Sequence, residues 1–533
     1  MRSSFLLLPL LLAVACSAPS TDGGEQSADA LTASATAKKL QKLGAKPCAD
    51  DKKWLCHHVT VPLDHANPGG KKIDVAFAVH PAPDATRKGT LARVTGGPGY
   101  AGLDTLGDLG DTDKQIPKAM DVVRFDLRGV KRSGALECKK AAGEYYLGGL
   151  RTASAADEAR QTAKAKAFAA ACVKEMGIPS SEVQFYSTDQ AIEDLEAIRA
   201  LLGQEKIVLY GLSYGTQFAQ TYTKNHLDRV ERLVIDGVVD LTLRHIPYMT
   251  NLNDGITKLL DLTLDDCAKK PACLAPFAGA PGATDAAKVH AAYAAVASEL
   301  DATSKTLSWK KKDGSTSPRT YSRVQLDTTT FNAVGTPETR LGLQKALGAA
   351  FKQHDFMPLL KLSYDSAELD GDTAPKEGTA GADPDMSDAM YYAFTCNDYG
   401  LDASTEAARE KLYLEAGRKL WSDARVLAPY YGDLPCMYWP TPKKAEDTPA
   451  LKQHGVPVMV VGATGDGATP VDMGEATAKR HEDGFIVTVE GGSHVMWGGG
   501  NACADGVINP FVLEGKRPTA RATRCAGTFV TAE

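Results

Sequence analysis

The fold predicted for this chain is decided by the stretch Ile207-Val208-Leu209-Tyr210-Gly211-Leu212-Ser213-Tyr214-Gly215-Thr216. Its first four residues predict a short buried strand, a Gly-x-Ser-x-Gly turn follows directly, and residues 217–225 predict a helix. A serine in this context matches a nucleophile elbow, which exposes the hydroxyl above the sheet and leaves the Tyr214 N–H free to stabilise an oxyanion. Because so short a motif also arises by chance in chains of this size, the interpretation depends on the rest of the sequence.

Strands and helices alternate along the chain on both sides of this stretch. The helix between residues 187 and 203 is expected to begin with a capping box formed by Ser187 and Gln190. Repeated βα units predict an α/β fold, in which helices cover both faces of a mostly parallel sheet. The apolar runs that predict the other strands are 73–79, 90–94, 121–125, 232–235, 456–461 and 485–489.

A glycine-rich loop, Thr95-Gly96-Gly97-Pro98-Gly99, follows the predicted strand at 90–94. Residues 97–102 match the Gly-x-Gly-x-x-Gly pattern of a dinucleotide site, but Pro98 removes a backbone donor where a phosphate would need one. The better interpretation is that this loop lends a second oxyanion N–H to a hydrolase site, from Gly97 or, as the next choice, from Gly96. A plain tight turn is the alternative.

The N-terminal segment predicts export. An apolar run from Phe5 to Ala15 is too short to span a bilayer and is typical of a signal peptide. The run leads into Leu12-Ala13-Val14-Ala15-Cys16, which resembles a bacterial lipoprotein box, so we expect Cys16 to carry lipid. Simple cleavage nearby is the alternative. The following residues, to about Lys46, are rich in Ser, Ala, Thr and Gly and predict a flexible tether.

The cysteines agree with export. Ten of them lie beyond Cys16, and an even number in an exported chain predicts disulfides. Neither a Cys-x-x-Cys nor a His-Glu-x-x-His spacing occurs, so we expect no zinc site and no cofactor. The net charge of −6 argues against nucleic acid as a partner. Sequence does not fix the connectivity, and the simplest pairing, in chain order, is Cys48–Cys56, Cys138–Cys172, Cys267–Cys273, Cys396–Cys436 and Cys503–Cys525.

The pattern changes in the middle of the chain. Between residues 241 and 450, alanine-rich helical runs alternate with loops, and residues 312–315 predict a small hairpin. We expect this insertion to form a mainly helical cap domain over the site. The predicted order is a lipoprotein-type signal peptide at 1–16, a tether at 17–46, the hydrolase core at 47–240, the cap at 241–450 and the C-terminal part of the core at 451–533.

Two polar residues, both C-terminal to Ser213 in the chain, complete the set of residues that a serine hydrolase requires. Asp466 follows the predicted strand at 456–461, and His494 lies on a glycine-rich loop after the strand at 485–489. The chain order Ser…Asp…His is that of α/β-hydrolases. We therefore predict that His494 Nε2 takes the proton of Ser213, while Asp466 fixes the imidazole tautomer and stabilises the imidazolium.

Several short segments of the chain also occur in an order that is typical of one family. They are Val61-Pro62-Leu63-Asp64, Gly96-Gly97-Pro98-Gly99, Asp126-x-Arg128-Gly129, residues 211–216, Asp236-Gly237, the Gly-x-x-x-Asp-x-x-Thr-Pro pattern at 462–470 and Gly492-Ser493-His494. These segments resemble the α/β-hydrolases of the proline-iminopeptidase type, especially the secreted bacterial tripeptidyl aminopeptidase-like branch. The chain departs from that pattern at Thr95, where histidine is common, and at Lys131 and Gly467, where glycine and proline are common.

The resemblance implies an exported serine peptidase that releases short peptides or single residues from free N-termini. A carboxylic-ester hydrolase is the alternative, because the same triad serves both reactions. A non-catalytic hydrolase-fold binding protein is a third class, disfavoured because the triad residues are intact. The expected partner is a peptide or small acyl substrate, with a membrane involved only through lipid on Cys16, and the oligomeric state is left open.

A preference for free N-termini requires a group that stabilises the substrate ammonium. A buried carboxylate does so, and an acetylated N-terminus leaves it unpaired. The candidate that the resemblance suggests is Asp398, in Phe394-Thr395-Cys396-Asn397-Asp398, where a disulfide at Cys396 would hold it in place. A helix-end or surface aspartate is the alternative.

Overall fold

The computed structural model describes residues 34–532 except 105, 107–114, 366–369, 373–384, 402, 424 and 441–454. The predicted signal peptide, Cys16 and the first part of the predicted tether lie outside the described residues. In the described part of the chain, no helix is both long enough and apolar enough to cross a membrane.

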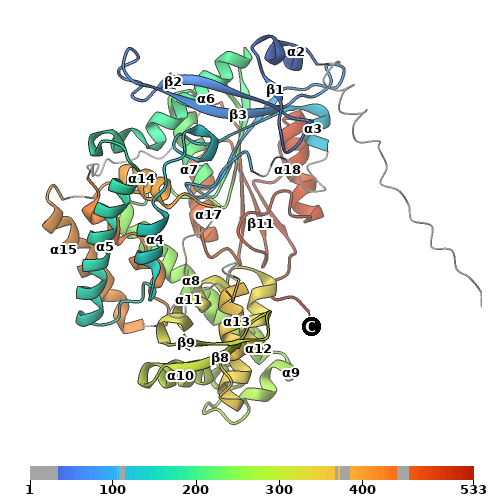
Figure 1. Cartoon of the computed structure of the whole chain (residues 1–533). Coiled ribbons are helices and arrows are strands. Elements are labelled where there is room, and N and C mark those ends of the chain that lie inside the picture. The colour runs from blue at the N-terminus through green and yellow to red at the C-terminus, as the bar shows by residue number, and fades with distance from the viewer. Residues whose placement is uncertain are drawn as a thin grey trace, which may run out of the picture.

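A ten-stranded sheet lies at the centre of the fold (Figure 1). Its first strands pair antiparallel, from β1 through β2 and β3 to β5, and the strands from β5 to β12 form a continuous parallel array. This mostly parallel sheet confirms the predicted α/β fold. In spatial order the strands are β1 (Lys46–Pro47), β2 (Leu55–Pro62), β3 (Lys72–His80), β5 (Asp121–Phe125), β4 (Thr90–Val94), β6 (Ile207–Leu212), β7 (Val230–Asp236), β10 (Val458–Ala463), β11 (Gly484–Val489) and β12 (Ala522–Cys525).

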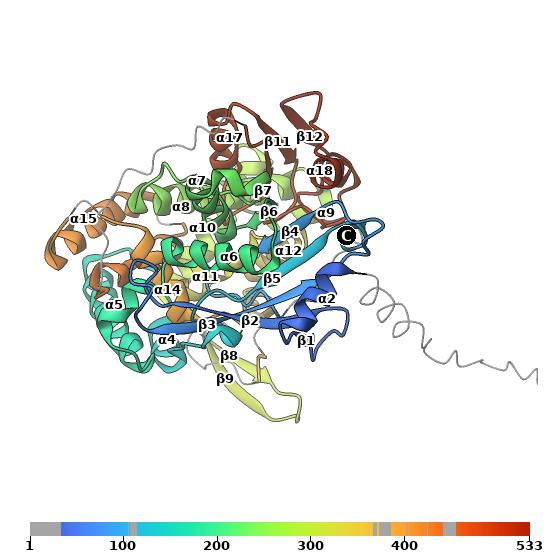
Figure 2. The ribbon, with the colours of Figure 1, turned by 90° about the horizontal axis from the view of Figure 1, so that it is seen from above.

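Alternate residues of the central strands face two different helix layers. In β6, Leu209 packs in the core formed with α6 and α7, whereas Val208 and Tyr210 pack in the core that contains α18. Because both faces are covered, the whole strand is apolar. Figure 2 shows α6 and α7 along one side of the central strands, and α18 lies beside β11 and β12. The bounds are α6 (Thr188–Leu202), α7 (Tyr214–Asn225), α17 (Val471–Arg480), α18 (Ala502–Glu514) and the short α3 (Ile116–Ala119).

The helical insertion begins with a group that has its own hydrophobic core. Leu264, Val296 and Leu347 are buried there, away from the sheet. This group lies at the lower end of Figure 1 and includes a two-stranded hairpin, which extends beyond the helices in Figure 2. It comprises α8 (His245–Ala268), α9 (Pro271–Leu274), α10 (Asp285–Ala302), β8 (Lys305–Lys310), β9 (Thr316–Tyr321), α11 (Arg323–Ala333), α12 (Pro337–Gln353) and α13 (Met357–Asp365).

A second helical group shares the main hydrophobic core. Tyr145 stacks on Phe168, and Phe168 contacts the ring of Tyr392 edge-on. These contacts join α4 (Lys139–Tyr146) and α5 (Ala155–Glu175) to α14 (Asp388–Asp398), with α15 (Glu406–Lys419), α16 (Ala428–Tyr431) and the 3-10 turn η7 (Leu434–Tyr438) beside them. This second helical group thus draws on residues 139–175, which precede the predicted cap.

Part of the predicted tether is helical rather than flexible. Residues Ala35–Lys42 form α2, which Ser34 caps by accepting the N–H of Ala37. Ala37 and Leu40 are fully buried, and the carboxylate of Asp84 accepts the N–H of Ala35. The small-residue composition concealed the spacing of Ala37 and Leu40, which places both on one face of a helix.

The predicted capping box at α6 is wrong. Ser187 is the N-cap residue, but its side chain makes no capping hydrogen bond. The N–H of Thr188 donates instead to Asp398, and the Gln190 side chain accepts the N–H of His65. The carboxylate of Asp398 and the backbone N–H of His65, both from distant segments, therefore replace the local pairing that the spacing predicted.

The ten cysteines beyond Cys16 form five disulfides in the described chain. The pairs follow chain order, as in the simplest arrangement above: Cys48–Cys56, Cys138–Cys172, Cys267–Cys273, Cys396–Cys436 and Cys503–Cys525.

Candidate active site

Ser213 lies on a sharp turn between β6 and α7. Its φ of 57° and ψ of −126° are sterically unfavourable for a residue with a side chain, which is the backbone strain expected of a nucleophile elbow. Two glycines make the turn feasible: a Cβ on Gly211 would lie 2.1 Å from the carbonyl oxygen of Gly215, and a Cβ on Gly215 would lie 2.3 Å from that of Val94. Glycine is required at both positions because strand and helix approach so closely.

The predicted oxyanion loop packs directly against this turn. A Cβ on Gly96 would lie 2.8 Å from Ser213 Cβ, so Gly96 is the loop residue in contact with the serine. Gly97 has a φ of 109°, and its added Cβ would lie 2.7 Å from the N–H nitrogen of Gly99. Tyr214, whose N–H is the other predicted donor, is the first residue of α7. Gly96 and Tyr214 therefore lie directly beside Ser213, and Gly97 follows Gly96 in the loop. The roles of all three residues as donors stay predictions.

Asp466 and His494 are brought together by two neighbouring strands. Asp466 follows β10 and His494 follows β11, and His494 Nδ1 lies 2.8 Å from Asp466 Oδ2. The N–H groups of Ala468 and Thr469 donate to Asp466 Oδ1, and the Thr469 hydroxyl donates to Oδ2 at 2.8 Å. These donors fix the carboxylate toward the imidazole.

The other imidazole nitrogen points away from this carboxylate. His494 Nε2 is buried and has no hydrogen-bond partner among the described residues. The ring packs against Gly237, where a Cβ would lie 2.8 Å from Cε1. Gly237 also has a φ of 67°, so glycine is required there for two reasons.

The electrostatics of the pair favour an imidazolium beside a carboxylate. Burial alone would lower the pKa of His494, but the charge and hydrogen bond of Asp466 and the charge of Asp236 raise it above its ordinary value. Burial would likewise raise the pKa of Asp466, but the charge and hydrogen bond of His494 and the hydrogen bonds from Thr469 lower it. A base that gains a proton in this setting is stabilised by its neighbours.

Asp236, at the end of β7, connects the serine to the histidine loop. Its carbonyl oxygen accepts the N–H of Ser213 at 2.9 Å, and its carboxylate accepts the N–H groups of Met496 and Trp497. Burial raises the pKa of this carboxyl group to about 6, although the two N–H donors oppose the shift. Sequence reasoning used Asp236 only as part of a family segment, and its distance of 258 residues from His494 gave no signal of contact.

Asp398, the predicted amine-binding residue, is the last residue of α14 and contacts α6 and α7. Its carboxylate accepts the N–H of Thr188 at 3.0 Å, the hydroxyl of Thr188 at 2.6 Å and the side-chain amide of Gln217 at 2.9 Å. The Thr188 hydroxyl also lies 2.6 Å from that of Tyr214. The Thr188 hydroxyl therefore links the carboxylate of Asp398 to Tyr214, the residue after Ser213. Asp398 itself is half-buried.

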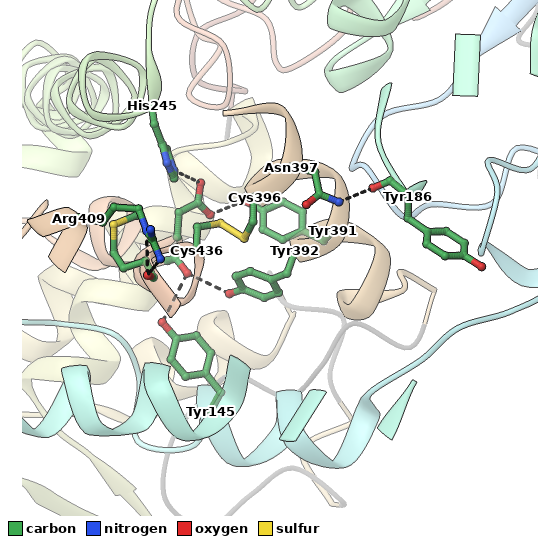
Figure 3. The surroundings of a disulfide bond; sticks show 12 residues. Tyr145, Tyr186, His245, Tyr391, Tyr392, Cys396, Asn397, Arg409 and Cys436 are labelled. Carbon is green, nitrogen blue, oxygen red and sulfur yellow. Dashed lines mark hydrogen bonds and ion pairs between the residues drawn. A yellow bond between two sulfur atoms is a disulfide. The ribbon is translucent and has the colours of Figure 1, made fainter. Parts of the chain in front are cut away.

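A second buried carboxylate, Asp433, belongs to the second helical group, where its carbonyl oxygen accepts the N–H of Cys436 at 3.0 Å. Figure 3 shows His245 and Tyr391 near the Cys396–Cys436 disulfide. Asp433 accepts the hydroxyl of Tyr391 at 2.9 Å and lies 3.2 Å from His245 Nε2. Both His245 and Asp433 are almost completely buried. Sequence reasoning missed this pair, because neither residue stands in a motif.

The described residues hold no group of three His, Cys, Asp or Glu side chains that could bind a metal ion.

Comparison with known families places the fold of this site. Residues 105–263, which contain the elbow, match a family model described as alpha/beta hydrolase fold, and residues 425–525, which contain Asp466 and His494, match one described as TAP-like protein. The chain has the α/β-hydrolase fold.

Relatives of the chain carry both peptidase and esterase names. Serine protease Hip1 from Mycobacterium tuberculosis is 28% identical across 87% of this chain and 86% of its own. Carboxylesterase B from the same species is 29% identical across 88% and 86%. A tripeptidyl aminopeptidase from Streptomyces lividans is 27% identical across 98% and 95%. These matches confirm the resemblance to the tripeptidyl aminopeptidase-like branch and the enzyme class, a serine hydrolase.

Proposed function

We propose that this α/β-hydrolase is an exported serine aminopeptidase that cleaves short peptides from free N-termini. The observation that carries the proposal is the hydrogen bonding of the two ring nitrogens of His494. Its Nδ1 lies 2.8 Å from Asp466, while its Nε2 is buried and has no partner among the described residues. An imidazole held in this way offers Nε2 to the hydroxyl of a nucleophile, and Ser213 supplies that hydroxyl on the elbow.

The mechanism is acyl transfer in two stages. Ser213 Oγ attacks the scissile carbonyl carbon as its proton passes to His494 Nε2. The N–H of Tyr214 and a second N–H from Gly97 or Gly96 receive the negative charge on the carbonyl oxygen. The C–N bond then breaks as His494 protonates the leaving amine, and an acyl-enzyme remains on Ser213. Water, deprotonated by His494, releases the N-terminal peptide and restores the serine.

Recognition of a free N-terminus is assigned to Asp398. Hydrogen bonds from Thr188 and Gln217 hold the half-buried carboxylate of Asp398 in place. A substrate ammonium beside it gains a charge-assisted hydrogen bond, whereas an acetylated N-terminus does not. The Cys396–Cys436 disulfide, two residues before Asp398, ties the end of α14 to η7 (Figure 3).

A carboxylic-ester hydrolase is the second candidate function. The relative named carboxylesterase B, 29% identical to this chain, favours it. The same serine and histidine cleave both bond types, so the substrate pocket decides between the two functions.

The deciding experiment compares one tripeptide amide in its free and N-acetylated forms, beside a simple aryl ester. We expect acetylation to reduce kcat/KM by roughly 30- to 5,000-fold, the equivalent of ~2–5 kcal/mol for a buried charge left unpaired. The Asp398→Asn variant should lose this discrimination, and the ratio of the two substrates serves as its internal control. If acetylation has no effect on the wild type and the ester is the best substrate, the esterase function replaces the aminopeptidase.

Export is supported by the five disulfides, since disulfides persist in oxidising compartments. We infer that the mature chain begins at Cys16 and carries lipid there, which makes the membrane contact an anchor only. Mass spectrometry of the mature N-terminal peptide tests this directly. A mature N-terminus beyond Cys16 contradicts it.

A further inference from the structure

Arg340 is a fully buried arginine of the insertion, near the start of α12. Among the described residues, all hydrogen-bond acceptors of its guanidinium are backbone carbonyl oxygens. Nε donates to Val334 at 2.8 Å, Nη2 reaches Gly335 at 3.4 Å and Nη1 donates to Phe529 at 2.8 Å. The guanidinium carbon also lies 4.5 Å from the centre of the Phe529 ring. These contacts join the insertion to the C-terminal segment.

The two remaining contacts reach the loops that carry the Asp–His pair. Nη2 donates to the carbonyl oxygen of Gly465, the residue before Asp466, and Nη1 donates to that of Gly492 at 2.9 Å, two residues before His494. A Cβ on Gly465 would lie 2.9 Å from both terminal nitrogens of Arg340 and 2.5 Å from the Gly492 oxygen. Glycine at 465 thus leaves the space that the guanidinium occupies between the two loops.

Burying a charged guanidinium costs folding free energy unless hydrogen bonds and an opposite charge compensate for the lost hydration. Burial lowers the pKa of Arg340 to about 10, against the opposing charges of Asp466 and Glu338. Asp466 is itself buried. While His494 is neutral, the Asp466–His494 pair contains no positive charge to balance the carboxylate of Asp466. A fixed cation behind the two loops offsets that charge.

We propose that Arg340 is a positioning residue of the hydrolase site, which holds the Asp466 and His494 loops at a fixed separation and offsets the charge of Asp466. The inference rests on the proposed roles of Ser213, His494 and Asp466. It assigns to the insertion a part in organising the proton-transfer pair, besides covering the substrate.

The charged groups around the pair determine the direction of the effect. Asp466 and Glu338 act on Arg340, and Asp466 and Asp236 act on His494. Tyr248, on α8, also lies close enough to Asp466 to be affected by its charge. Removing the cation leaves two carboxylates acting on His494 with less opposition, so the imidazole should hold its proton to a higher pH.

The test uses Arg340→Met, which removes the charge and the donors, and Arg340→Lys, which keeps the charge but loses the planar fork. The matched control is Arg319→Met: Arg319 is also a buried arginine of the insertion, and it donates to the carbonyl oxygen of Gly371, away from the triad. The full chain of each variant is assayed between pH 5 and 9 for its rate of labelling by a fluorophosphonate and for hydrolysis of an aryl ester. Neither readout requires peptidase activity, so failure of the aminopeptidase proposal is seen separately in the peptide series.

For Arg340→Met we expect labelling to slow by about 10- to 100-fold at pH 7, because small displacements of catalytic groups have effects of this size. The midpoint of the acid limb should move up by about 1 pH unit. Arg340→Lys should keep the wild-type midpoint with an intermediate rate, and Arg319→Met should match the wild type in both.

A wild-type midpoint and rate in Arg340→Met, or the same losses in Arg319→Met, would overturn the inference. If Arg340→Met does not fold, Arg340→Lys decides: a wild-type labelling rate in that variant excludes the positioning role.

Discussion

The backbone N–H of Ser213 donates to the carbonyl oxygen of Asp236 at 2.9 Å. The carboxylate of the same aspartate accepts the N–H groups of Met496 and Trp497, two and three residues beyond His494. One buried residue at the end of β7 is therefore bonded to both the elbow and the histidine loop. Its state of ionisation should influence both stability and catalysis.

Asp236→Asn should change how stability depends on pH. Burial raises the pKa of Asp236 to about 6 in the folded chain, so the folded state binds this proton more tightly than the unfolded state. The protonated carboxyl group therefore stabilises the folded state by up to about 3 kcal/mol at low pH, and this contribution is lost as the pH rises from about 4 to about 6. Urea unfolding of both proteins at pH 4.5 and 6.5 measures this effect: the stability of the wild type relative to the variant should fall over that interval. An unchanged difference contradicts it.

The pH profile of the wild type should report His494. Because Asp466 and Asp236 raise the pKa of His494 above its usual 6.5, kcat/KM should fall on the acid side with a midpoint above that value. The neutral imidazole is the base, so activity is present above the midpoint and lost below it.

Asp466→Asn should reduce kcat by about 10⁴-fold, because the asparagine does not hold the required tautomer. The control is Asp472→Asn, which should stay near the wild-type rate. Asp472 lies on α17, the helix that follows Asp466, and its carboxylate accepts an exposed hydrogen bond from Asn251 of α8. Full activity in Asp466→Asn would remove this residue from the triad.

Gly96→Ala tests the contact between the oxyanion loop and the nucleophile. The added Cβ would lie 2.8 Å from Ser213 Cβ, so either the loop or the serine must move. A displacement of this size should reduce kcat/KM by about 100-fold while the protein stays folded. The matched control is Gly506→Ala in α18, where a Cβ meets nothing within 4 Å and activity should not change. Equal activity in the two variants would separate the loop from catalysis.

Removal of the Cys396–Cys436 disulfide should be more damaging than removal of the Cys267–Cys273 disulfide. The first closes a loop of 40 residues and the second a loop of 6. The chain-entropy estimate is about 4 kcal/mol for the longer loop and about 2 kcal/mol for the shorter. Paired Cys→Ala variants and urea unfolding measure the difference. Only the first pair should also reduce discrimination against acetylated peptides, since Asp398 lies beside it; equal loss of discrimination in both contradicts this link.

Much of the fold could be predicted because its signals are local. The apolar strand, the glycines and the serine at 207–216 specify the elbow by short-range sterics, and the loops after β10 and β11 placed Asp466 and His494 at one edge of the sheet. Strand β2 (Leu55–Pro62) was missed, because its interior Cys-His-His-Val-Thr run lacks a clear apolar alternation.

The residues that escaped prediction act through distant backbone groups. Arg340 contacts Gly465 and Gly492, 125 and 152 residues away, and backbone carbonyls leave no trace in side-chain patterns. Asp398 was predicted as an amine-binding residue, but its contact with the N–H of Thr188, 210 residues away, was not. Such contacts arise from the packing of the insertion on the core, which local propensity does not encode.

A serine that is the nucleophile of a working triad reacts covalently with a fluorophosphonate, so this probe decides whether Ser213 has that role. The probe should form a single covalent adduct, which peptide mapping places on Ser213. Labelling should disappear in Ser213→Ala and fall by several orders of magnitude in His494→Ala, with both variants folded. An adduct on another serine, or undiminished hydrolysis by Ser213→Ala, would contradict the account.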